Sequence, residues 1–447
     1  MSKQIGIRRE DKNEWERRVP LTPEQVRCLI AKGIPFTVQS SAIRVFTDAE
    51  YAAVGAHVGD DLSECPVILA VKEIPAGLLE PNKTYVFFSH VIKGQPHNMP
   101  MLKRVLELGC TIIDYEKITD EKHRRLIFFS RYAGIAGMVE SLWALGKRLA
   151  WEGISNPFET IKHAYEYDGL EDIMMTLGQI GEGIRADGYP RVLAPLVVGF
   201  AGYGNASTGA QEALDSFGIT EQVSPVDLPT YASAGGVSNR SIGKVVFHEE
   251  HMVERIADKG PCATSTFDLQ HYYNHPEEYK SVVPQYLDHL TILINGIFWT
   301  ERYPRIFTIA NARRLFANGQ PKLHVIGDIS CDIGGAVEIT RKATHPGAPV
   351  FVYNVATSEI TDGVEGNGPV VMAVDNLPCE LSREASQDFG QALKAFIPAI
   401  SGAAYTAPFE ELVLPPGIKR AVIAYHGELT PQYRYLKKSL DVINERC

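Results

Sequence analysis

Short apolar runs alternate with helically spaced segments over the first part of the chain. The apolar runs at 5–7, 35–39, 67–71, 84–88 and 111–115 each predict a strand. Between them, Thr22 followed by Pro23 predicts the start of a helix, and residues 48–54 and 99–108 have helical spacing. Strands that alternate with helices form parallel sheets with helices on both faces.

A second series of strands follows a long apolar helix, which we predict over residues 133–151. Residues 157–186 predict a pair of helices, and Ser382 and Pro398 are predicted to cap and stop a helix over 384–397. The later strands are predicted at 193–200, 244–247, 291–295, 324–328 and 370–374.

Together these patterns predict an α/β protein with two Rossmann-like domains, each built on a parallel sheet and separated by an active-site cleft. The N-terminal domain comprises residues 1–133 and is completed by the C-terminal segment 384–447. Residues 134–154 form a bridging helix, and residues 155–378 form a dinucleotide-binding domain.

A glycine-rich turn follows the apolar run 193–200 and leads into a helical segment at 211–217. Its pattern is Gly202-x-Gly204-x-x-Ser207, with a serine small enough for close packing at the third position. Such a turn lets backbone N–H groups at a helix start approach a pyrophosphate. The alternative is a tight strand-to-helix turn that binds no ligand.

The residue that separates NAD from NADP is expected about 20 positions after the turn, at a strand end. Here the candidate strand ends near 222–225, and Asp227 lies just beyond it. Neither an acidic residue nor an arginine stands at the tip, so the motif leaves the cofactor open.

Composition narrows the class of protein. The 447 residues include 54 acidic and 44 basic side chains, and the net charge of −10 argues against nucleic acid as a partner. The 7 cysteines are scattered without a C-x-x-C pair, which indicates reduced thiols and no metal site. No apolar run reaches the length of a membrane span, and we expect a cytoplasmic protein without a membrane partner.

Charged residues follow several predicted strands of the first domain. Lys72-Glu73 follows one buried run, His90 follows the next, and Glu116 follows the third. Carboxyl ends of parallel strands face the ligand crevice, so these side chains predict a site for a small zwitterion. The alternative for each is a solvated surface residue.

Polar residues also end strands in the second domain, namely Asn295, Asp328 and, in the loop beyond, Asp332. The two carboxylates could orient a nicotinamide, a ribose or a substrate ammonium group. The alternative is a turn capped by an aspartate.

Several longer motifs carry a family resemblance. They are Arg8-Arg9-Glu10, Val71-Lys72-Glu73, Phe87-Phe88-Ser89-His90, Ile113-Asp114-Tyr115-Glu116-Lys117 and Ile294-Asn295-Gly296-Ile297-Phe298-Trp299. In these motifs the chain resembles the lysine–2-oxoglutarate reductase half of the bifunctional aminoadipic semialdehyde synthases. It is more loosely similar to lysine-forming saccharopine dehydrogenase and alanine dehydrogenase.

The resemblance implies an oxidoreductase that forms saccharopine from lysine and 2-oxoglutarate. It favours NADP(H) as the cofactor, with NAD(H) still open. The implied acid–base pair is Lys72 and His90. The implied substrate-binding residues are Arg18, Glu73, Glu116, Arg125 and Asp332. The implied cofactor loop is Gly202, Gly204, Asn205 and Ser207, to which Asp227, Asn295 and Asp328 are added as strand-end candidates. Arg131 departs from the family pattern, which leads us to expect a smaller or neutral residue there.

Other interpretations stay open at this point. One is an amino-acid dehydrogenase that oxidises alanine or saccharopine, and another is a nucleotide-binding protein without enzymatic activity. A third is the cofactor-binding part of a transhydrogenase, which needs a membrane partner. A homo-oligomer is also open.

Overall fold

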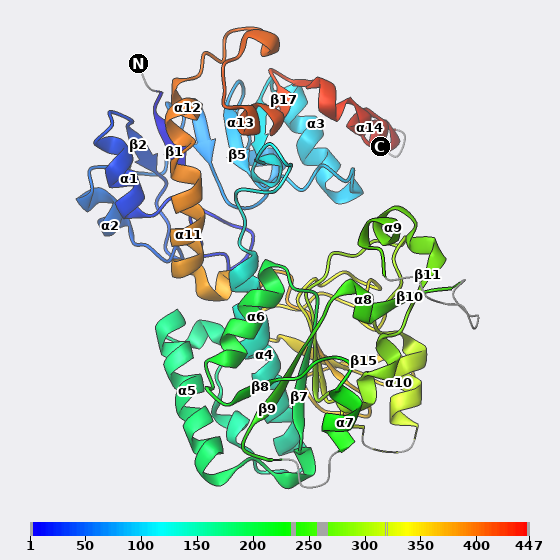
Figure 1. The fold of residues 1–447 in the computed structure, drawn as a ribbon. Coiled ribbons are helices and arrows are strands. Elements are labelled where there is room, and N and C mark those ends of the chain that lie inside the picture. Colours follow the sequence, from blue (N-terminus) through cyan, green and yellow to red (C-terminus); the bar gives the residue numbers. More distant parts are fainter. Residues whose placement is uncertain (1–2, 234–237, 257–266, 318, 320, 445–447) are drawn as a thin grey trace. The chain divides into compact units, whose positions relative to one another are not determined.

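The computed structural model describes residues 3–233, 238–256, 267–317, 319 and 321–444. The chain divides into two compact units (Figure 1). Unit 1 contains residues 1–129 and 382–447, and unit 2 contains residues 130–381. The sequence-based boundaries at 133 and 384 lie within a few residues of these limits. The long helix predicted as a bridge is grouped with unit 2.

Unit 1 is built on an eight-stranded sheet in the order β18-β17-β6-β5-β4-β1-β2-β3. Its six N-terminal strands are parallel, and β17 runs antiparallel to β6, so the C-terminal tail joins the first sheet. The strands are β1 Ile5–Ile7, β2 Phe36–Val38, β3 His57–Val58, β4 Val67–Leu69, β5 Thr84–Phe87, β6 Thr111–Asp114, β17 Val422–Tyr425 and β18 Glu428–Leu429. The helices are α1 Pro23–Ile30, α2 Asp48–Ala53, α3 Met99–Glu107, α11 Ser382–Lys394, α12 Ile397–Gly402, α13 Pro416–Arg420 and α14 Lys437–Asn444.

Unit 2 is built on a second eight-stranded sheet in the order β15-β14-β16-β13-β12-β7-β9-β8. All of its strands are parallel except β14, which is antiparallel to both β16 and β15. The strands are β7 Leu196–Ala201, β8 Thr220–Gln222, β9 Ile242–Phe247, β12 Ile292–Asn295, β13 Val325–Asp328, β14 Val350–Tyr353, β15 Ile360–Asp362 and β16 Val370–Met372, with a separate antiparallel pair β10 Val253–Arg255 and β11 Tyr279–Ser281. The helices are α4 Ser130–Trp151, α5 Leu170–Asp187, α6 Asn205–Asp215, α7 Leu228–Ser233, α8 Glu249–Met252, α9 Leu269–Asn274 and α10 Ile309–Phe316.

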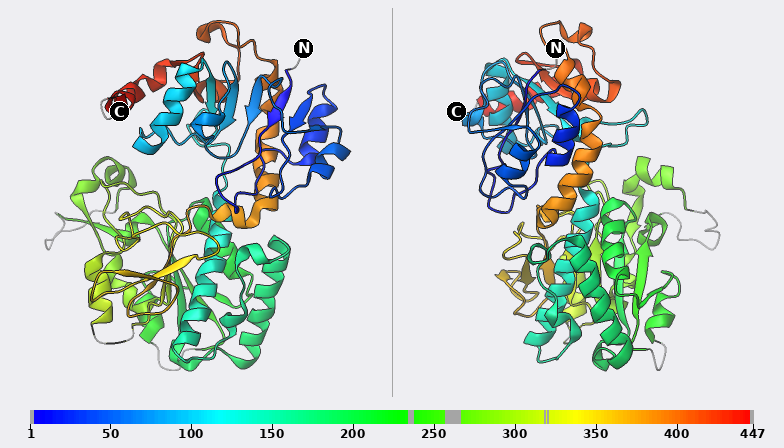
Figure 2. Two further views of the ribbon diagram at one scale, coloured as in Figure 1. Left: turned by 180° about the vertical axis from the view of Figure 1, so that it is seen from behind. Right: turned by 90° about the vertical axis from the view of Figure 1, so that its left-hand side faces the viewer.

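Helices cover both faces of the second sheet, which explains why its central strands β7, β12, β13 and β16 are mostly apolar and fully buried. Helices α4, α5 and α6 stand on one side of it, as the views in Figures 1 and 2 show. On the other face, Val197, Leu293 and Ile326 pack in one cluster with Leu315 of α10. The predicted α/β class with two mostly parallel sheets is confirmed.

Three helix predictions need correction. Residues 157–186 contain one α-helix, α5, and not two. Two short 3-10 turns precede it, because Asn156 caps the first turn and Gly169 takes φ 141° immediately before α5. Helix α6 begins at Asn205, earlier than predicted. Ser382 is the first residue of α11 and not its cap, and Pro398 lies in the first turn of α12, where its missing N–H has no cost.

Candidate active site

The backbone at Lys72 is fixed by a buried carboxylate. Glu10 follows β1, and its two oxygens accept hydrogen bonds from the backbone N–H groups of Val71 (2.7 Å) and Lys72 (3.0 Å). Burial, together with the charge of Glu16, raises the pKa of Glu10 to about 7. Glu10 therefore holds the end of β4 against the end of β1, its neighbour in the sheet.

The Lys72 side chain is half-buried in this corner of unit 1. Burial, followed by the positive charges of Arg18 and Lys12, lowers the pKa of its ammonium group. Among the described residues, none forms a hydrogen bond with this ammonium. A lysine whose neutral form is favoured, and which is not engaged by a neighbour, is suited to proton transfer.

His90 lies at the end of the adjacent strand β5 and is paired with Glu73. The His90 Nδ1 and Glu73 Oε1 atoms are 2.5 Å apart. Burial acts to raise the pKa of Glu73, but the hydrogen bond and charge of His90 outweigh it and lower that pKa to about 2. His90 has φ 50°, and its carbonyl accepts a hydrogen bond from Asn98 (3.1 Å), so its backbone is also held.

This pairing changes the interpretation of Glu73, which was predicted to bind substrate. One of its oxygens faces His90, and the other is buried without a hydrogen-bond partner in the described part of the chain, 3.7 Å from the Lys12 ammonium. Glu73 thus orients His90 so that Nε2 is the free ring nitrogen.

Asp114 organises the ends of β5 and β6. Its buried carboxylate accepts hydrogen bonds from the hydroxyl and N–H of Ser89, beside His90, and from the N–H of Glu116 (2.7 Å). Burial raises its pKa to about 6. The sequence-based site omitted Glu10 and Asp114, although both follow or end predicted strands, because their roles depend on partners distant in sequence.

The three remaining predicted residues of unit 1 already have charged partners. Arg18 is buried and forms a bidentate ion pair with Glu16, at 2.7 Å from Nε and 2.5 Å from Nη2, and its guanidinium lies 4.3 Å from the centre of the Phe129 ring. Glu116 and Arg125 pair with each other at 3.4 Å. Their roles in substrate binding stay predictions.

The glycine-rich turn in unit 2 connects β7 directly to α6. Gly202 has φ 90°, a conformation that favours glycine, and its N–H donates to the carbonyl of Phe247 in β9 (3.0 Å). Gly204 is the N-cap of α6, and Asn205 is its exposed first residue. The turn therefore has the strand–turn–helix context that a dinucleotide-binding motif requires.

The close packing expected from a third glycine is divided between two residues. Ser207 is fully buried, and its hydroxyl accepts a hydrogen bond from Gln211 (3.1 Å). A Cβ added to Gly209 would lie 2.1 Å from the carbonyl oxygen of Arg131 in α4. Arg131 pairs with Glu212 of α6 through two hydrogen bonds. The arginine that departs from the family pattern therefore links α4 to α6.

A pocket of about 500 Å³ opens beside the glycine turn, within the size range of small-molecule sites. Its lining comes from the ends of β7 and β12 and from the segments after β9. The lining residues are Gly202, Tyr203, Gly204, Glu249, Met252, Val253, Tyr272, Tyr273, Ser281, Gly296, Ile297, Phe298, Tyr303, Pro304 and Ile306. The structure thus brings Gly202 and Gly204 to this pocket, whereas Asn205, Ser207, Asp227, Asn295 and Asp328 are not among the described lining residues.

Asn295 and Asp328 bind each other instead. The Asn295 amide donates to Asp328 (2.8 Å), which also accepts hydrogen bonds from the Thr340 hydroxyl (2.5 Å) and the Cys331 N–H (3.2 Å). Burial raises the pKa of Asp328 to about 6. These contacts match the capped-turn alternative, and Asp332 lies exposed in the loop that they hold.

In the structure, Asp227 follows a strand that is not the neighbour of the glycine-turn strand. Strand β8, which precedes it, lies at the edge of the sheet and pairs only with β9, whereas β9 pairs with β7. The Asp227 carboxylate accepts the hydroxyl of Ser224 (2.7 Å) and is exposed. The prediction that Asp227 binds the cofactor followed chain order, which here differs from the strand order.

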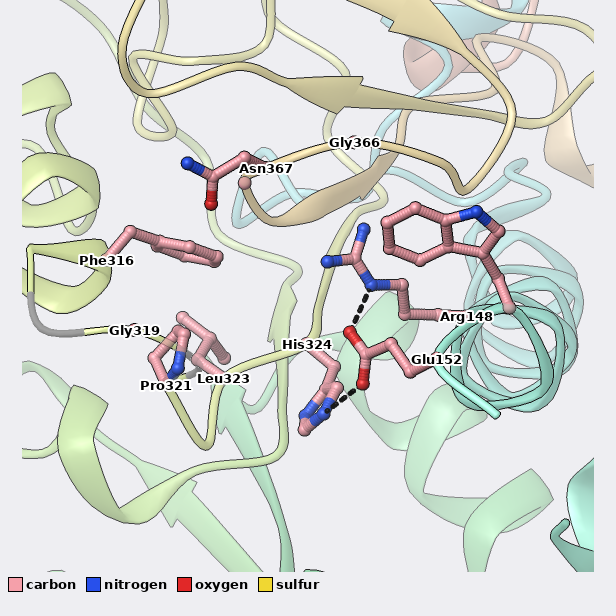
Figure 3. Close-up of a pocket in the computed structure, with 11 residues that line it drawn as sticks. Arg148, Glu152, Phe316, Gly319, Pro321, Leu323, His324, Gly366 and Asn367 are labelled. Atoms are coloured by element: carbon pink, nitrogen blue, oxygen red, sulfur yellow. Dashed lines mark hydrogen bonds and ion pairs between the residues drawn. The ribbon is translucent and has the colours of Figure 1, made fainter. Parts of the chain in front are cut away.

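A second pocket in unit 2, of about 420 Å³, lies at the opposite end of the strands (Figure 3). His324 directly precedes β13, and its Nε2 lies 3.5 Å from one oxygen of Glu152, whose other oxygen accepts from Arg148 Nε (2.6 Å). Because this pocket lies at the amino ends of the strands, away from their carboxyl ends, we assign it no catalytic role.

Two other kinds of site can be considered for the described residues, a metal site and a membrane-spanning helix. No group of three or more His, Cys, Asp or Glu side chains is arranged to hold a metal ion there. Nor does any helix in the described ranges have the length and apolar character needed to cross a membrane.

Comparison with known proteins agrees with this architecture. Residues 6–136 match the family model "Alanine dehydrogenase/PNT, N-terminal domain". The chain is 36% identical to "Alpha-aminoadipic semialdehyde synthase" of Arabidopsis thaliana over 97% of its own length and 41% of that protein. It is 25% identical to "Saccharopine dehydrogenase [NAD(+), L-lysine-forming]" of Emericella nidulans, covering 88% of the chain and 90% of the relative.

A solved L-alanine dehydrogenase has the same fold, with a TM-score of 0.62 at 16% identity over 98% of this chain and 99% of that one. The chain spans about two fifths of the semialdehyde synthase that it matches. The resemblance expected from the sequence is confirmed: over nearly its whole length the chain is similar to the alpha-aminoadipic semialdehyde synthases, its residues 6–136 match the N-terminal domain of the alanine dehydrogenase family, and its fold is that of an alanine dehydrogenase.

Proposed function

We propose that the chain is a nicotinamide-dependent oxidoreductase that condenses lysine with 2-oxoglutarate and reduces the product to saccharopine. The balanced reaction is lysine + 2-oxoglutarate + NAD(P)H + H⁺ → saccharopine + NAD(P)⁺ + H₂O. Similarity to the semialdehyde synthase over 97% of the chain supports this substrate pair.

The single observation that carries the proposal is the pairing of His90 with Glu73 at 2.5 Å, beside Lys72 with its lowered pKa. Two proton-transfer groups at the ends of adjacent parallel strands are what a condensation followed by loss of water requires.

The lysine substrate must attack the ketone as its free base. Lys72 accepts the proton that the ε-amine loses, because burial favours the neutral form of its own amine. His90, oriented by Glu73 through Nδ1, donates a proton from Nε2 to the carbinolamine oxygen, so that water leaves and an imine forms. A carboxylate of the substrate would lie near Arg18.

The residues around the second-unit pocket fit a dinucleotide. Gly202 and Gly204 leave the start of α6 open to a pyrophosphate, and the pocket beside them is large enough for a nucleoside. When bound, the nicotinamide supplies the hydride that reduces the imine.

A second candidate is the lysine-forming direction of the same reaction. The observation that favours it is the similarity to lysine-forming saccharopine dehydrogenase over 90% of that relative. The same two proton-transfer groups serve either direction of the reaction by microscopic reversibility. Rates measured in the saccharopine-forming and the lysine-forming directions therefore decide which direction is favoured.

The test is NADH and NADPH oxidation by the purified protein with lysine plus 2-oxoglutarate, compared with pyruvate plus ammonium. We expect turnover with the first pair, saccharopine detectable by mass spectrometry, and oxidation of added saccharopine by NAD⁺ or NADP⁺. Turnover only with pyruvate plus ammonium would instead identify an alanine dehydrogenase. Nucleotide binding without turnover on either pair would identify a non-enzymatic binding protein.

A further inference from the structure

Two buried carboxyl groups face each other in unit 2, outside both of the pockets described above. Glu140 lies in α4 and is fully buried, and Glu380 lies in the 3-10 turn Leu377–Leu381 and is 6% exposed. Neither Glu380 oxygen accepts a hydrogen bond from the described residues. The polar group that the Glu380 carboxyl meets is the carboxyl of Glu140. Because ionised carboxylates only accept hydrogen bonds, the two side chains can bind each other only through a shared proton.

Glu140 is held as the accepting member of this pair. Its Oε1 accepts the N–H of Ala164 (2.8 Å), and its Oε2 lies 2.8 Å from Nδ1 of His163. The His163 ring packs on Trp143, with 4.3 Å between ring centroids. Two N–H donors therefore stabilise the charge on Glu140, which leaves Glu380 as the member that carries the proton.

The surroundings of the pair offer little to balance a second negative charge. Within the described ranges, no lysine or arginine pairs with either carboxyl, and the other titratable groups that face them are His163 and Tyr165. Burial, followed by the charge and the hydrogen bond of Glu140, raises the pKa of Glu380 well above its usual 4.5. Ionisation of Glu380 would place a second buried carboxylate beside the first, which costs free energy.

The pair connects the first and the last segment of unit 2. Helix α4 begins at Ser130, where the chain enters unit 2, and the turn ends at Leu381, where the chain leaves it. One turn before Glu140, Gly137 lets these segments approach closely, since an added Cβ would lie 3.2 Å from Cδ1 of Leu377. The contact between the carboxyls therefore links the two ends of unit 2, at which the chain continues into unit 1.

We propose that the Glu140–Glu380 pair is a proton-dependent switch, which fixes the turn Leu377–Leu381 to α4 while one proton is shared and releases the turn when that proton is lost. Because the folded protein binds this proton more tightly than the unfolded chain, the stabilisation is complete below about pH 4.5. It is lost as the pH rises through the raised folded pKa of Glu380. The inference involves no substrate or cofactor and does not depend on the proposed function.

Hydrogen–deuterium exchange of the full-length protein tests this switch, with the peptide that contains residues 377–381 read by mass spectrometry from about pH 6 to about pH 9.5. Glu380→Gln is the reference, because its amide keeps a donor for Glu140 and cannot ionise. Comparison at equal pH removes the intrinsic pH dependence of exchange. We expect the wild-type rate to rise relative to the variant by up to about tenfold per pH unit once Glu380 ionises. The urea midpoint should fall over the same range in the wild type only.

Glu182→Gln is the matched control, because Glu182 is an exposed carboxylate of α5 in the same unit, and this variant should behave as the wild type does. Glu380→Met provides a second variant without the ionisable group, whose stability should be lower but equally independent of pH. A constant ratio of exchange rates between wild type and Glu380→Gln overturns the inference. So does faster exchange in Glu380→Gln than in the wild type at the highest pH. A failure to form saccharopine would bear on the proposed function alone.

Discussion

Lys72 and His90 occupy equivalent positions on neighbouring strands, but their surroundings differ. Lys72 is surrounded by positive charge from Arg18 and Lys12, whereas His90 is paired with a carboxylate. Lys72 is thereby biased toward its neutral form, whereas Nδ1 of His90 is held by Glu73. This difference is the reason we propose proton acceptance by Lys72 and proton donation by His90.

Replacement of Lys72 by methionine should remove proton transfer with little effect on packing. We expect kcat for saccharopine formation to fall by about 10²–10⁴-fold, the usual contribution of a general acid or base, with KM for both substrates nearly unchanged. Lys93→Met is the control, because Lys93 is an exposed lysine of the same unit. Steady-state kinetics of the two variants and the wild type measure these changes. Full turnover by Lys72→Met would refute the role of Lys72 in proton transfer.

The low pKa of Glu73 predicts a pH dependence of stability. Its folded value of about 2 lies below the ordinary 4.5, so the folded protein binds this proton less readily than the unfolded chain. The stabilisation is complete above about pH 5, is lost as the pH falls toward 2, and amounts to about 3 kcal/mol at most.

Urea unfolding between pH 7 and pH 3 should therefore show the wild type losing its advantage over Glu73→Gln as the pH falls. The exposed residue Glu64 provides the control variant Glu64→Gln, for which the difference from wild type should stay constant. A pH-independent difference for Glu73→Gln would contradict the pairing with His90.

At this scale the sequence could locate Lys72, Glu73 and His90 because each directly follows an apolar run. It could not predict that Glu73 pairs with His90, or that Arg18 is already paired with Glu16. Such contacts depend on side-chain directions at strand ends. Asp328 illustrates the same limit, since its hydrogen-bond donors Asn295 and Thr340 lie in separate segments of the chain.

Among the elements, α4 and α6 approach most closely where glycines face the partner backbone. A Cβ on Gly134 would lie 1.9 Å from the carbonyl oxygen of Ala206 and 2.7 Å from the N of Ala210. Helix α6 carries the glycine-rich turn at its start. The position of the turn therefore depends on this helix contact.

Gly134→Ala should force the two helices apart and lower the free energy of unfolding by about 1–3 kcal/mol or more. Gly183→Ala is the contrasting control, because Gly183 is exposed in α5 and an added Cβ meets no atom within 4 Å. That change should raise the free energy of unfolding by about 0.5–1 kcal/mol. Urea midpoints measure both, and equal stability of Gly134→Ala and wild type would disprove the close contact.

The sequence predicted most elements of both sheets, because buried parallel strands and their helices have distinct periodicities. It did not predict that β9 lies between β7 and β8. Strand order depends on which edge a returning strand occupies, and hydrophobic periodicity is the same for either arrangement. The expectation that Asp227 lies beside the glycine-rich turn followed from this one ambiguity.

For the molecule as a whole, the two units differ in how the chain builds them. Unit 2 is one continuous segment, whereas unit 1 combines both ends of the chain. Within unit 1, β17 pairs with β6, and Phe389 of α11 stacks on Phe129 with 4.4 Å between ring centroids. Residues 1–129 alone would lack both contacts.

A fragment of residues 130–381 should therefore unfold cooperatively and bind NADH, whereas residues 1–129 alone should not fold. Joining residue 129 to residue 382 through a flexible linker should restore a folded unit 1. Circular dichroism and thermal unfolding of the three proteins test this. Cooperative unfolding of residues 1–129 alone would show that the C-terminal segment is dispensable.

The same pairing of β17 with β6 fixes an order of events during translation. Ribosomes add ~5–20 residues per second, so β17 emerges roughly 15–60 seconds after the first 129 residues. Throughout that interval the nascent chain exposes an unpaired strand edge at β6, the kind of edge that recruits other strands. Unit 2 can therefore be completed before unit 1, in which β6 keeps this open edge until β17 has been translated.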